Sequence, residues 1–208
     1  MIGTARFYGI IDLGYVSPSA VAGVASRMIE GGVDVLQLRA KKLGEREIEE
    51  LAREIHAVSK PAGVPLVIND YPRIAAAVGA EGVHVGQDDR TVAEARAQAG
   101  GGCFVGKSTH SVDQALAAVD EGADYIGFGP LFATPTKPDY KPIGTEDIRR
   151  VHELVKIPIF CIGGIKAENL SSVLAAGARR VVIVSGILQA PDIAGYVRAA
   201  KSRIIGFR

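Results

Sequence analysis

Short runs of apolar residues alternate along the chain with longer segments in which apolar residues return every three or four positions. The runs predict eight buried β-strands, at residues 7–12, 33–38, 66–69, 82–85, 103–105, 125–128, 159–162 and 181–184. The segments between them predict helices, with apolar stripes formed by Ile48, Leu51, Ala52 and Ile55 and by Val112, Ala115, Leu116 and Val119. Strands joined by helices in this order favour right-handed crossovers and a parallel sheet.

A glycine-containing tetrapeptide recurs four times, at residues 31–34, 79–82, 122–125 and 177–180. Each copy falls where a predicted helix ends and a strand begins, and glycine supplies the turn that ends a helix. Because the copies precede the second, fourth, sixth and eighth strands, they indicate two βα modules repeated four times. We therefore expect one α/β domain over residues 1–208, a (β/α)₈ TIM barrel with short loops. An open doubly wound sheet is the alternative.

The composition suits an ordered enzyme-sized domain, with 208 residues of which 48% are hydrophobic. Lys and Arg number 24 against 23 Asp and Glu, so nothing in the overall charge indicates nucleic acid or an acidic membrane as partner. Cys103 and Cys161 lie in apolar runs and are expected to be buried reduced thiols. No signal peptide or membrane-spanning run is evident, which makes a cytoplasmic protein, with homo-oligomers possible, the expectation.

Most of the predicted strands run directly into polar residues. Gln37, Arg39 and Lys41 end the second strand, Asn69 and Asp70 end the third, and the fourth and fifth lead to Asp89 and Ser108. In a barrel the carboxyl ends of all strands face one mouth, where catalysis takes place. The polar ends are therefore expected to form one site.

Asp70 and Asp89 follow neighbouring strands, and two water-accessible carboxylates at such a place suit Mg²⁺. Helix N-capping is the ordinary alternative for each aspartate. Arg39, Lys41 and Lys137, with the Ser108 hydroxyl, form a cationic group that suits a diphosphate and would neutralise it as it leaves.

A second anion site is expected after the last two strands, where residues 163–164 are a diglycine and residues 184–186 read Val-Ser-Gly. Barrels often bind a monophosphate there with backbone N–H groups. The irregular, proline-rich segment 131–144 is expected to be a mobile active-site loop. Among the histidines, His110 is a candidate for substrate contact, His84 is expected to be structural, and His56 and His152 are expected to be exposed.

The ordered set of polar strand ends resembles the thiamine phosphate synthase family. The matching stretches cover nearly the whole chain, at residues 37–41 (QLRAK), 69–70 (ND), 82–89 (GVHVGQDD), 108–110 (STH), 134–137 (TPTK), 163–165 (GGI) and 184–185 (VS). The resemblance implies a small TIM barrel that joins an aminopyrimidine diphosphate to a thiazole monophosphate with release of diphosphate. It further implies a dissociative reaction, in which diphosphate leaves before the thiazole nitrogen captures the pyrimidine cation.

Residue roles also follow from the resemblance. Contact with the pyrimidine diphosphate is implied for Gln37, Arg39, Lys41, Asn69, Ser108 and Lys137. Mg²⁺ binding is implied for Asp70 and Asp89, and contact with the thiazole phosphate for Thr134, Thr136, Gly164, Val184 and Ser185. The first strand departs from the family pattern, because it ends Ile10-Ile11-Asp12 where Ile-Thr-Asp is common.

Two other functions remain open from the sequence. A related thiazole tautomerase shares the fold, but its relatives tend to lack the metal carboxylates and to carry a histidine where Pro130 follows Phe128-Gly129. The ending Ser185-Gly186-Ile187 leans toward that branch. A non-catalytic barrel that binds phosphorylated ligands is the other alternative, although binding alone would not need both anion sites.

Overall fold

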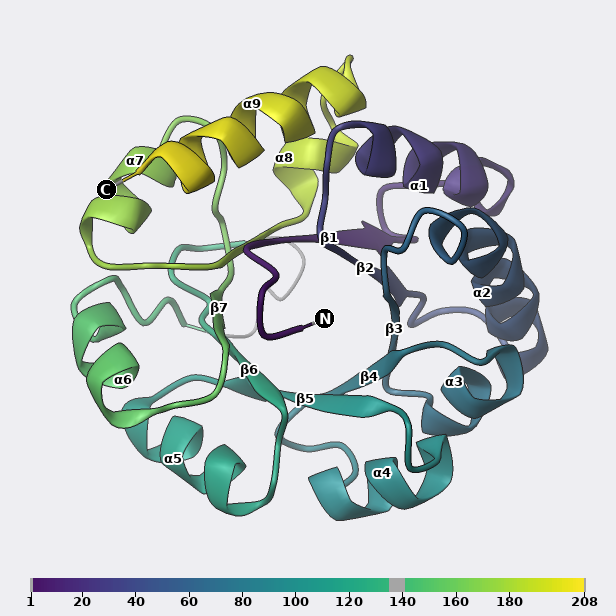
Figure 1. Ribbon diagram of the computed structural model, residues 1–208, viewed down its shortest axis with the longest axis horizontal. Helices are drawn as coiled ribbons and strands as arrows, with labels where there is room; N and C mark the ends of the chain where they lie inside the picture. Colours follow the sequence, from purple (N-terminus) through teal and green to yellow (C-terminus); the bar gives the residue numbers. More distant parts are fainter. Residues whose placement is uncertain (1, 135–140, 208) are drawn as a thin grey trace.

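Eight short parallel strands pair in chain order and close into a barrel, because β1 pairs with β8 as well as with β2 (Figure 1). The computed structural model describes residues 2–134 and 141–207. The strands are β1 Phe7–Asp12, β2 Val35–Arg39, β3 Leu66–Asn69, β4 Gly82–Val85, β5 Phe104–Thr109, β6 Tyr125–Phe128, β7 Ile159–Cys161 and β8 Val181–Ile183. The predicted (β/α)₈ barrel is confirmed, and the open sheet is excluded.

Helices form a ring around this barrel, one or more after each strand (Figure 1). They are α1 Val21–Glu30, preceded by the 3₁₀ turn η1 Pro18–Ala20, then α2 Glu45–Ser59, α3 Pro72–Val78, α4 Val92–Ala99, α5 Val112–Asp120, α6 Ile148–Leu154, α7 Leu170–Ala175, α8 Ser185–Leu188 and α9 Ile193–Gly206. No helix in residues 2–134 and 141–207 is long and apolar enough to cross a membrane.

Apolar side chains pack in two layers, one inside the barrel and one between the barrel and the helices. Successive strand residues point to opposite faces, so each strand supplies both layers. The inner layer is small and aromatic, and it contains Ala5, Tyr8, Ile10, Val35, Val67, Tyr125, Phe160 and Val182. This layer fills the barrel below the carboxyl ends of the strands and forms the floor on which a site at the mouth is built.

The repeated glycine turns take the conformation expected of them. Gly32, Gly79, Gly122 and Gly177 have φ values of 93°, 71°, 82° and 109°, which favour glycine over residues with a Cβ. Each lies between a helix and the next even-numbered strand. Both cysteines are buried and free, as predicted.

The boundaries of four strands differ from the predicted ones. β2 begins at Val35 because the Val33 N–H donates instead to the Met28 carbonyl at the end of α1 (3.1 Å). β5 extends to Thr109 because residues 107–109 pair with β6. β7 and β8 each end one residue earlier than predicted.

Three predictions about helix faces were wrong. Leu116 is 38% exposed, and Ala118 takes its place on the buried face of α5. His56 is buried, where its Nε2 pairs with Glu81 Oε1 at 3.1 Å. His152 is half-buried rather than exposed, and burial lowers its pKa to about 4, helped by the charges of Arg179 and Arg180.

Candidate active site

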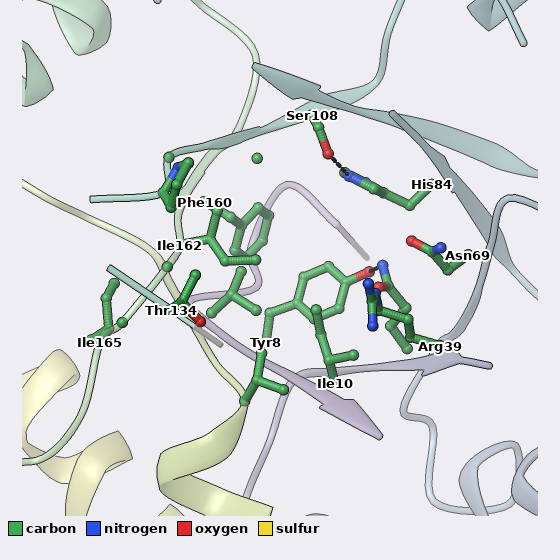
Figure 2. A pocket seen from close by; sticks show the side chains of 18 of the residues that line it. Tyr8, Ile10, Arg39, Asn69, His84, Ser108, Thr134, Phe160, Ile162 and Ile165 are labelled. Carbon is green, nitrogen blue, oxygen red and sulfur yellow. Dashed lines mark hydrogen bonds between the residues drawn. The ribbon is translucent and has the colours of Figure 1, made fainter. Parts of the chain in front are cut away.

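A pocket lies at the carboxyl ends of the strands, above the inner aromatic layer (Figure 2). Eight residues singled out from the sequence line it, namely Gln37, Arg39, Asn69, Ser108, Thr134, Gly164, Val184 and Ser185. They come from β2, β3 and β5 and from the segments after β6, β7 and β8. Gln37 and Ser185, which are 148 positions apart in the chain, thus share one cavity.

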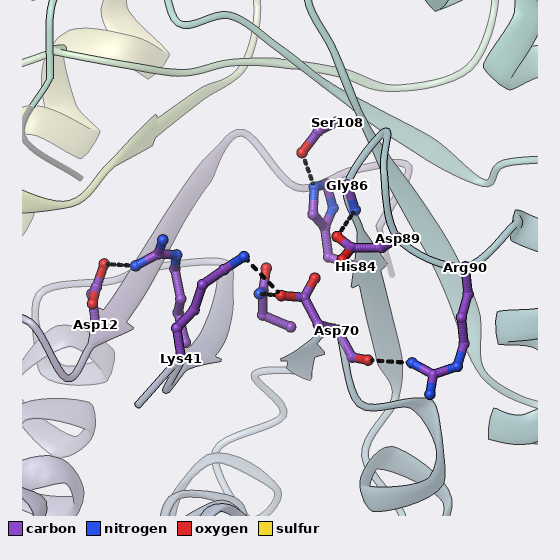
Figure 3. A network of polar contacts seen from close by, with 10 residues as sticks. Asp12, Lys41, Asp70, His84, Gly86, Asp89, Arg90 and Ser108 are labelled. Atoms are coloured by element: carbon purple, nitrogen blue, oxygen red, sulfur yellow. Dashed lines mark hydrogen bonds and ion pairs between the residues drawn. The ribbon is translucent and has the colours of Figure 1, made fainter. Parts of the chain in front are cut away.

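Lys41, Asp70 and Asp89 do not line this pocket but form a polar network beside it (Figure 3). Thr136 and Lys137, which the sequence also singled out, lie outside the described residues. The mobile-loop prediction for residues 131–144 likewise involves undescribed residues, 135–140. The two described ends of that segment are tied together, since Gly144 N donates to the Leu131 carbonyl at 3.2 Å.

Arg39 is held in place by an aspartate to which the sequence reasoning assigned no role. Its Nη1 lies 2.7 Å from Asp12 Oδ2, and the two side chains are only 15% and 5% exposed. The other oxygen of Asp12 accepts a hydrogen bond from the Gly14 N–H at 2.8 Å. Because Asp12 and Arg39 are opposite each other in the β1–β2 register, the sheet itself brings them together. The guanidinium is thereby fixed at the pocket wall.

Asp70 has an unusual backbone conformation that directs its carboxylate. Its φ of 67° is the only positive value among the non-glycine residues that the structure describes. The Asp70 N–H donates to the His84 carbonyl at 2.9 Å, and Arg90 Nη1 donates to the Asp70 carbonyl at 3.1 Å (Figure 3). Two bonds from β4 and its following loop therefore hold the strained residue.

The Asp70 carboxylate interacts with three polar side chains. Asn69 Nδ2 donates to Oδ2 at 2.6 Å, and Lys41 Nζ lies 3.3 Å from the same oxygen. Asp89 also interacts with it, and burial followed by the charge of Asp89 raises the pKa of Asp70 above its ordinary value. Asp89 is itself oriented, because its Oδ2 accepts from the Gly86 N–H at 2.8 Å.

Helix capping does not explain either aspartate. The N-cap of α3 is Tyr71, which makes no side-chain cap hydrogen bond. The N-cap of α4 is Thr91, whose hydroxyl accepts from the Glu94 N–H. Two carboxylates that repel each other and cap no helix are suited to binding a cation. No cluster of three or more potential metal ligands occurs among the described residues, so water and substrate oxygens would complete the shell, as is usual for Mg²⁺.

The diglycine after β7 packs tightly against the segment after β6. Gly163 and Gly164 have φ values of 98° and 65°, and a Cβ on Gly164 would lie 2.7 Å from the Phe132 Cβ. The Phe132 N–H donates to the Gly163 carbonyl at 3.1 Å. Close approach of these two backbones places Thr134 in the pocket wall beside Gly164.

His84, which was expected to be structural, lines the pocket. Its Nε2 lies 3.0 Å from Ser108 Oγ, and its Nδ1 lies 3.0 Å from the Tyr125 hydroxyl (Figure 2). His84 is opposite Asn69 in the β3–β4 register. A residue opposite a predicted site residue lies on the same face of the sheet, so this pairing is what would have indicated His84.

Most of the other pocket residues were not singled out as site residues, and they are mainly apolar or aromatic. Tyr8, Tyr125 and Phe160 form the floor, with ring centroids 5.4 to 6.1 Å apart. His110, the histidine that was a candidate for substrate contact, also lines the pocket, and its Nδ1 interacts with the Gly129 carbonyl. An aromatic floor below polar walls suits an aromatic ring that carries phosphate groups.

The fold and the pocket define a (β/α)₈ barrel with a polar, partly charged site at its C-terminal mouth, the arrangement of barrel enzymes. Residues 7–187 match the family model described as thiamine monophosphate synthase, and the chain belongs to that family. This confirms the resemblance seen in the sequence.

Relatives agree over nearly the whole chain. A thiamine-phosphate synthase of Chloroflexus aurantiacus is 42% identical, covering 96% of this chain and 92% of its own length. One from Thermus thermophilus is 46% identical, with 86% and 87% covered. The solved thiamine phosphate pyrophosphorylase of Pyrococcus furiosus superposes with a TM-score of 0.89 at 29% identity, covering 98% of this chain and 97% of that one.

Proposed function

We propose that this chain is a transferase that joins an aminopyrimidine diphosphate to a thiazole monophosphate, giving thiamine phosphate and diphosphate. One observation carries the proposal. Arg39, Asn69 and Ser108 share a single pocket with Gly164 and Ser185, so a diphosphate site and a monophosphate site would open into the same cavity. The names of the relatives, at 42% and 46% identity, support the same activity. The substrates are small molecules, and the proposal places the enzyme in the cytoplasm.

The diphosphate would lie between the cationic wall and the acidic pair. Arg39, fixed by Asp12, can donate to phosphate oxygens in a bidentate manner. Lys41 contributes a compact positive charge beside Asp70. Asp70 and Asp89 would hold Mg²⁺, which, when bound, neutralises charge on the departing diphosphate.

The thiazole phosphate would lie on the opposite wall. Gly164 allows a phosphate to approach the backbone closely, because it has no side chain of its own. Thr134 and Ser185 add hydroxyl groups, and Val184 lines the wall between them. Ser185 is the first residue of α8, where backbone N–H groups are available.

In this arrangement the reaction is a displacement of diphosphate by the thiazole nitrogen. The bond between the pyrimidine methylene carbon and the diphosphate oxygen breaks, and both electrons leave with the diphosphate. The pyrimidine ring and its amino group share the positive charge until the lone pair of the thiazole nitrogen forms the new C–N bond. The protein residues named here stabilise a leaving anion and hold two partners in contact.

Three assays separate the proposed function from the two alternatives. Diphosphate release that requires both substrates and Mg²⁺ is expected of the transferase. Isomerisation of the thiazole carboxylate without Mg²⁺ would instead support a tautomerase, and saturable binding without turnover would support a binding protein. The presence of Asp70 and Asp89, and of Pro130 after Phe128-Gly129, favours the first outcome.

A further inference from the structure

A chain of four hydrogen bonds crosses the floor of the pocket from β2 to β5. Gln37 Nε2 donates to the Tyr8 hydroxyl at 2.8 Å, and that hydroxyl lies 3.1 Å from the Tyr125 hydroxyl. The Tyr125 hydroxyl lies 3.0 Å from His84 Nδ1, and His84 Nε2 lies 3.0 Å from Ser108 Oγ. All five residues line the pocket, so the chain joins two predicted substrate-binding residues through three others.

One direction of this hydrogen-bond chain gives every hydroxyl proton in it an acceptor. An amide nitrogen donates and cannot accept, so the Tyr8 hydroxyl accepts from Gln37. The Tyr8 proton reaches an acceptor within the chain only if it goes to Tyr125, and the Tyr125 proton then goes to His84 Nδ1. A neutral imidazole that accepts at Nδ1 carries its proton at Nε2 and donates it to Ser108.

The two tyrosines remain neutral links in this chain. Both are buried, and burial is the largest cause that raises the pKa of each phenol above its ordinary value. Their rings also pack against Phe160, at 5.4 Å for Tyr8 and 5.7 Å for Tyr125, so the hydroxyl positions are fixed by the inner layer. Reversing the order of donors would leave the proton of the buried Tyr8 hydroxyl without an acceptor in the chain, which is unfavourable.

The two ends of the chain therefore present opposite groups to the pocket. At one end one N–H of the Gln37 amide donates to Tyr8, and the amide oxygen remains as an acceptor. At the other end Ser108 Oγ accepts from His84, which leaves its own hydroxyl proton to be donated. An aminopyrimidine offers a matching pair, an amine that donates and a ring nitrogen that accepts.

We propose that Tyr8, Tyr125 and His84 are positioning residues that fix Gln37 as acceptor and Ser108 as donor, and so select a 4-aminopyrimidine over its 4-oxo analogue. The oxo ring has a carbonyl in place of the amine and an N–H in place of an adjacent ring nitrogen, so its pattern is reversed. Its ring N–H would meet the Ser108 proton instead of an acceptor, and turning Ser108 into an acceptor that donates to His84 requires the other tautomer of His84. The inference that the substrate is an aminopyrimidine rests on the proposed function, whereas the direction of the hydrogen-bond chain does not.

The direction is tested in the protein without substrate. Two-bond ¹H–¹⁵N correlation spectra of protein with ¹⁵N-labelled histidines report the tautomer, and a His84→Gln spectrum assigns the His84 signals. We expect the Nε2–H tautomer at His84, and a detectable share of the Nδ1–H tautomer once Gln37→Met removes the residue that sets the direction. An Nδ1–H tautomer in the unaltered protein, or an unchanged spectrum in Gln37→Met, would overturn the proposal.

Selectivity is tested by comparing kcat/KM for the 4-amino and 4-oxo pyrimidine diphosphates. In Tyr125→Phe we expect the ratio of the two values to fall on the order of tenfold, because the orientation of Ser108 is no longer imposed. Tyr196→Phe is the matched control, since it removes a hydroxyl that accepts from Ala167 N at 2.8 Å outside the floor. An equal ratio in the two variants would contradict the proposal. If the unaltered protein turns over neither compound, the proposed function is refuted. The tautomer experiment then still tests the direction of the hydrogen-bond chain.

Discussion

The carboxylates of Asp70 and Asp89 interact at the mouth of the barrel, although the charge of Asp89 disfavours the ionised form of Asp70. Burial and the charge of Asp89 together raise the pKa of Asp70, and the partly exposed Lys41 offsets only part of this effect. The left-handed backbone of Asp70 is a second cost at the same residue. A site that keeps two such costs is the kind that functional residues form.

Replacing Asp70 by Asn should lower turnover on the order of 100-fold or more, because a neutral amide cannot hold Mg²⁺ against the departing diphosphate. Steady-state rates of diphosphate release at increasing Mg²⁺ would measure the effect, with circular dichroism to check the fold. Asp88→Asn is the matched control, since Asp88 is the exposed neighbour of Asp89. Normal activity of Asp70→Asn at ordinary Mg²⁺ would remove the metal assignment.

The same variant should be more stable than the unaltered protein at pH 7. The pKa of Asp70 is raised in the folded state, so the folded protein binds the proton more tightly than the unfolded chain does. Stability contributed by this group is full below the unfolded pKa of about 3.9 and is lost as the pH rises through the folded value. Asn resembles the protonated form and also tolerates the left-handed conformation.

Thermal unfolding at pH 7 and pH 4, without Mg²⁺, measures this prediction. Asp70→Asn should raise the melting temperature at pH 7, and the gain should shrink as the pH falls toward 4. A lower melting temperature at pH 7 would mean that the contacts of Asp70 with Lys41 and Asn69 outweigh its burial and its repulsion by Asp89.

Asp12→Asn should lower kcat/KM for the pyrimidine diphosphate on the order of tenfold, because Arg39 loses the charge that fixes its position. The KM for the thiazole phosphate should stay within about twofold, since the site proposed for that partner is on the other wall. Asp124→Asn is the control, because it breaks another ion pair, in which Asp124 Oδ2 lies 2.8 Å from Arg96 Nη2 of α4. Neither residue of that pair lines the pocket. A comparable rise in both Michaelis constants would argue against this role of Asp12.

Gly164→Ala should raise the KM for the thiazole phosphate on the order of tenfold. The added Cβ would come within 2.7 Å of the Phe132 Cβ and would push the two backbones apart at the proposed phosphate site. Gly63→Ala is a close control, because Gly63 has a similar φ of 69° but nothing within 4 Å of the added atom. If both variants bind the thiazole phosphate equally well, Gly164 does not form that site.

The strand ends could be predicted from the sequence because each is marked by local chemistry. Asn69 and Asp70 follow an apolar run directly, Ser108 follows one two residues later, and a barrel requires such ends to meet. The glycine turns could be predicted for a similar reason, since helices commonly end at a left-handed residue and glycine adopts that conformation most readily.

The residues that the sequence did not indicate as site residues are brought to the site by the register of neighbouring strands. Asp12 reaches Arg39, and His84 shares a face with Asn69, only through the register of neighbouring strands. Tyr125 fits inside the barrel because Gly106 opposite it has no side chain, and a Cβ there would lie 2.0 Å from the tyrosine ring. Such relationships are properties of the closed sheet and leave no mark in a single run of residues.

The central claim is that one cavity holds both phosphorylated partners closely enough for them to react. Mass spectrometry of the products formed from the aminopyrimidine diphosphate and the thiazole phosphate, with Mg²⁺, tests it most directly. We expect thiamine phosphate and diphosphate in equal amounts, and no coupled product when either substrate is omitted. Thiazole and pyrimidine recovered unjoined after prolonged incubation with well-folded protein would contradict it.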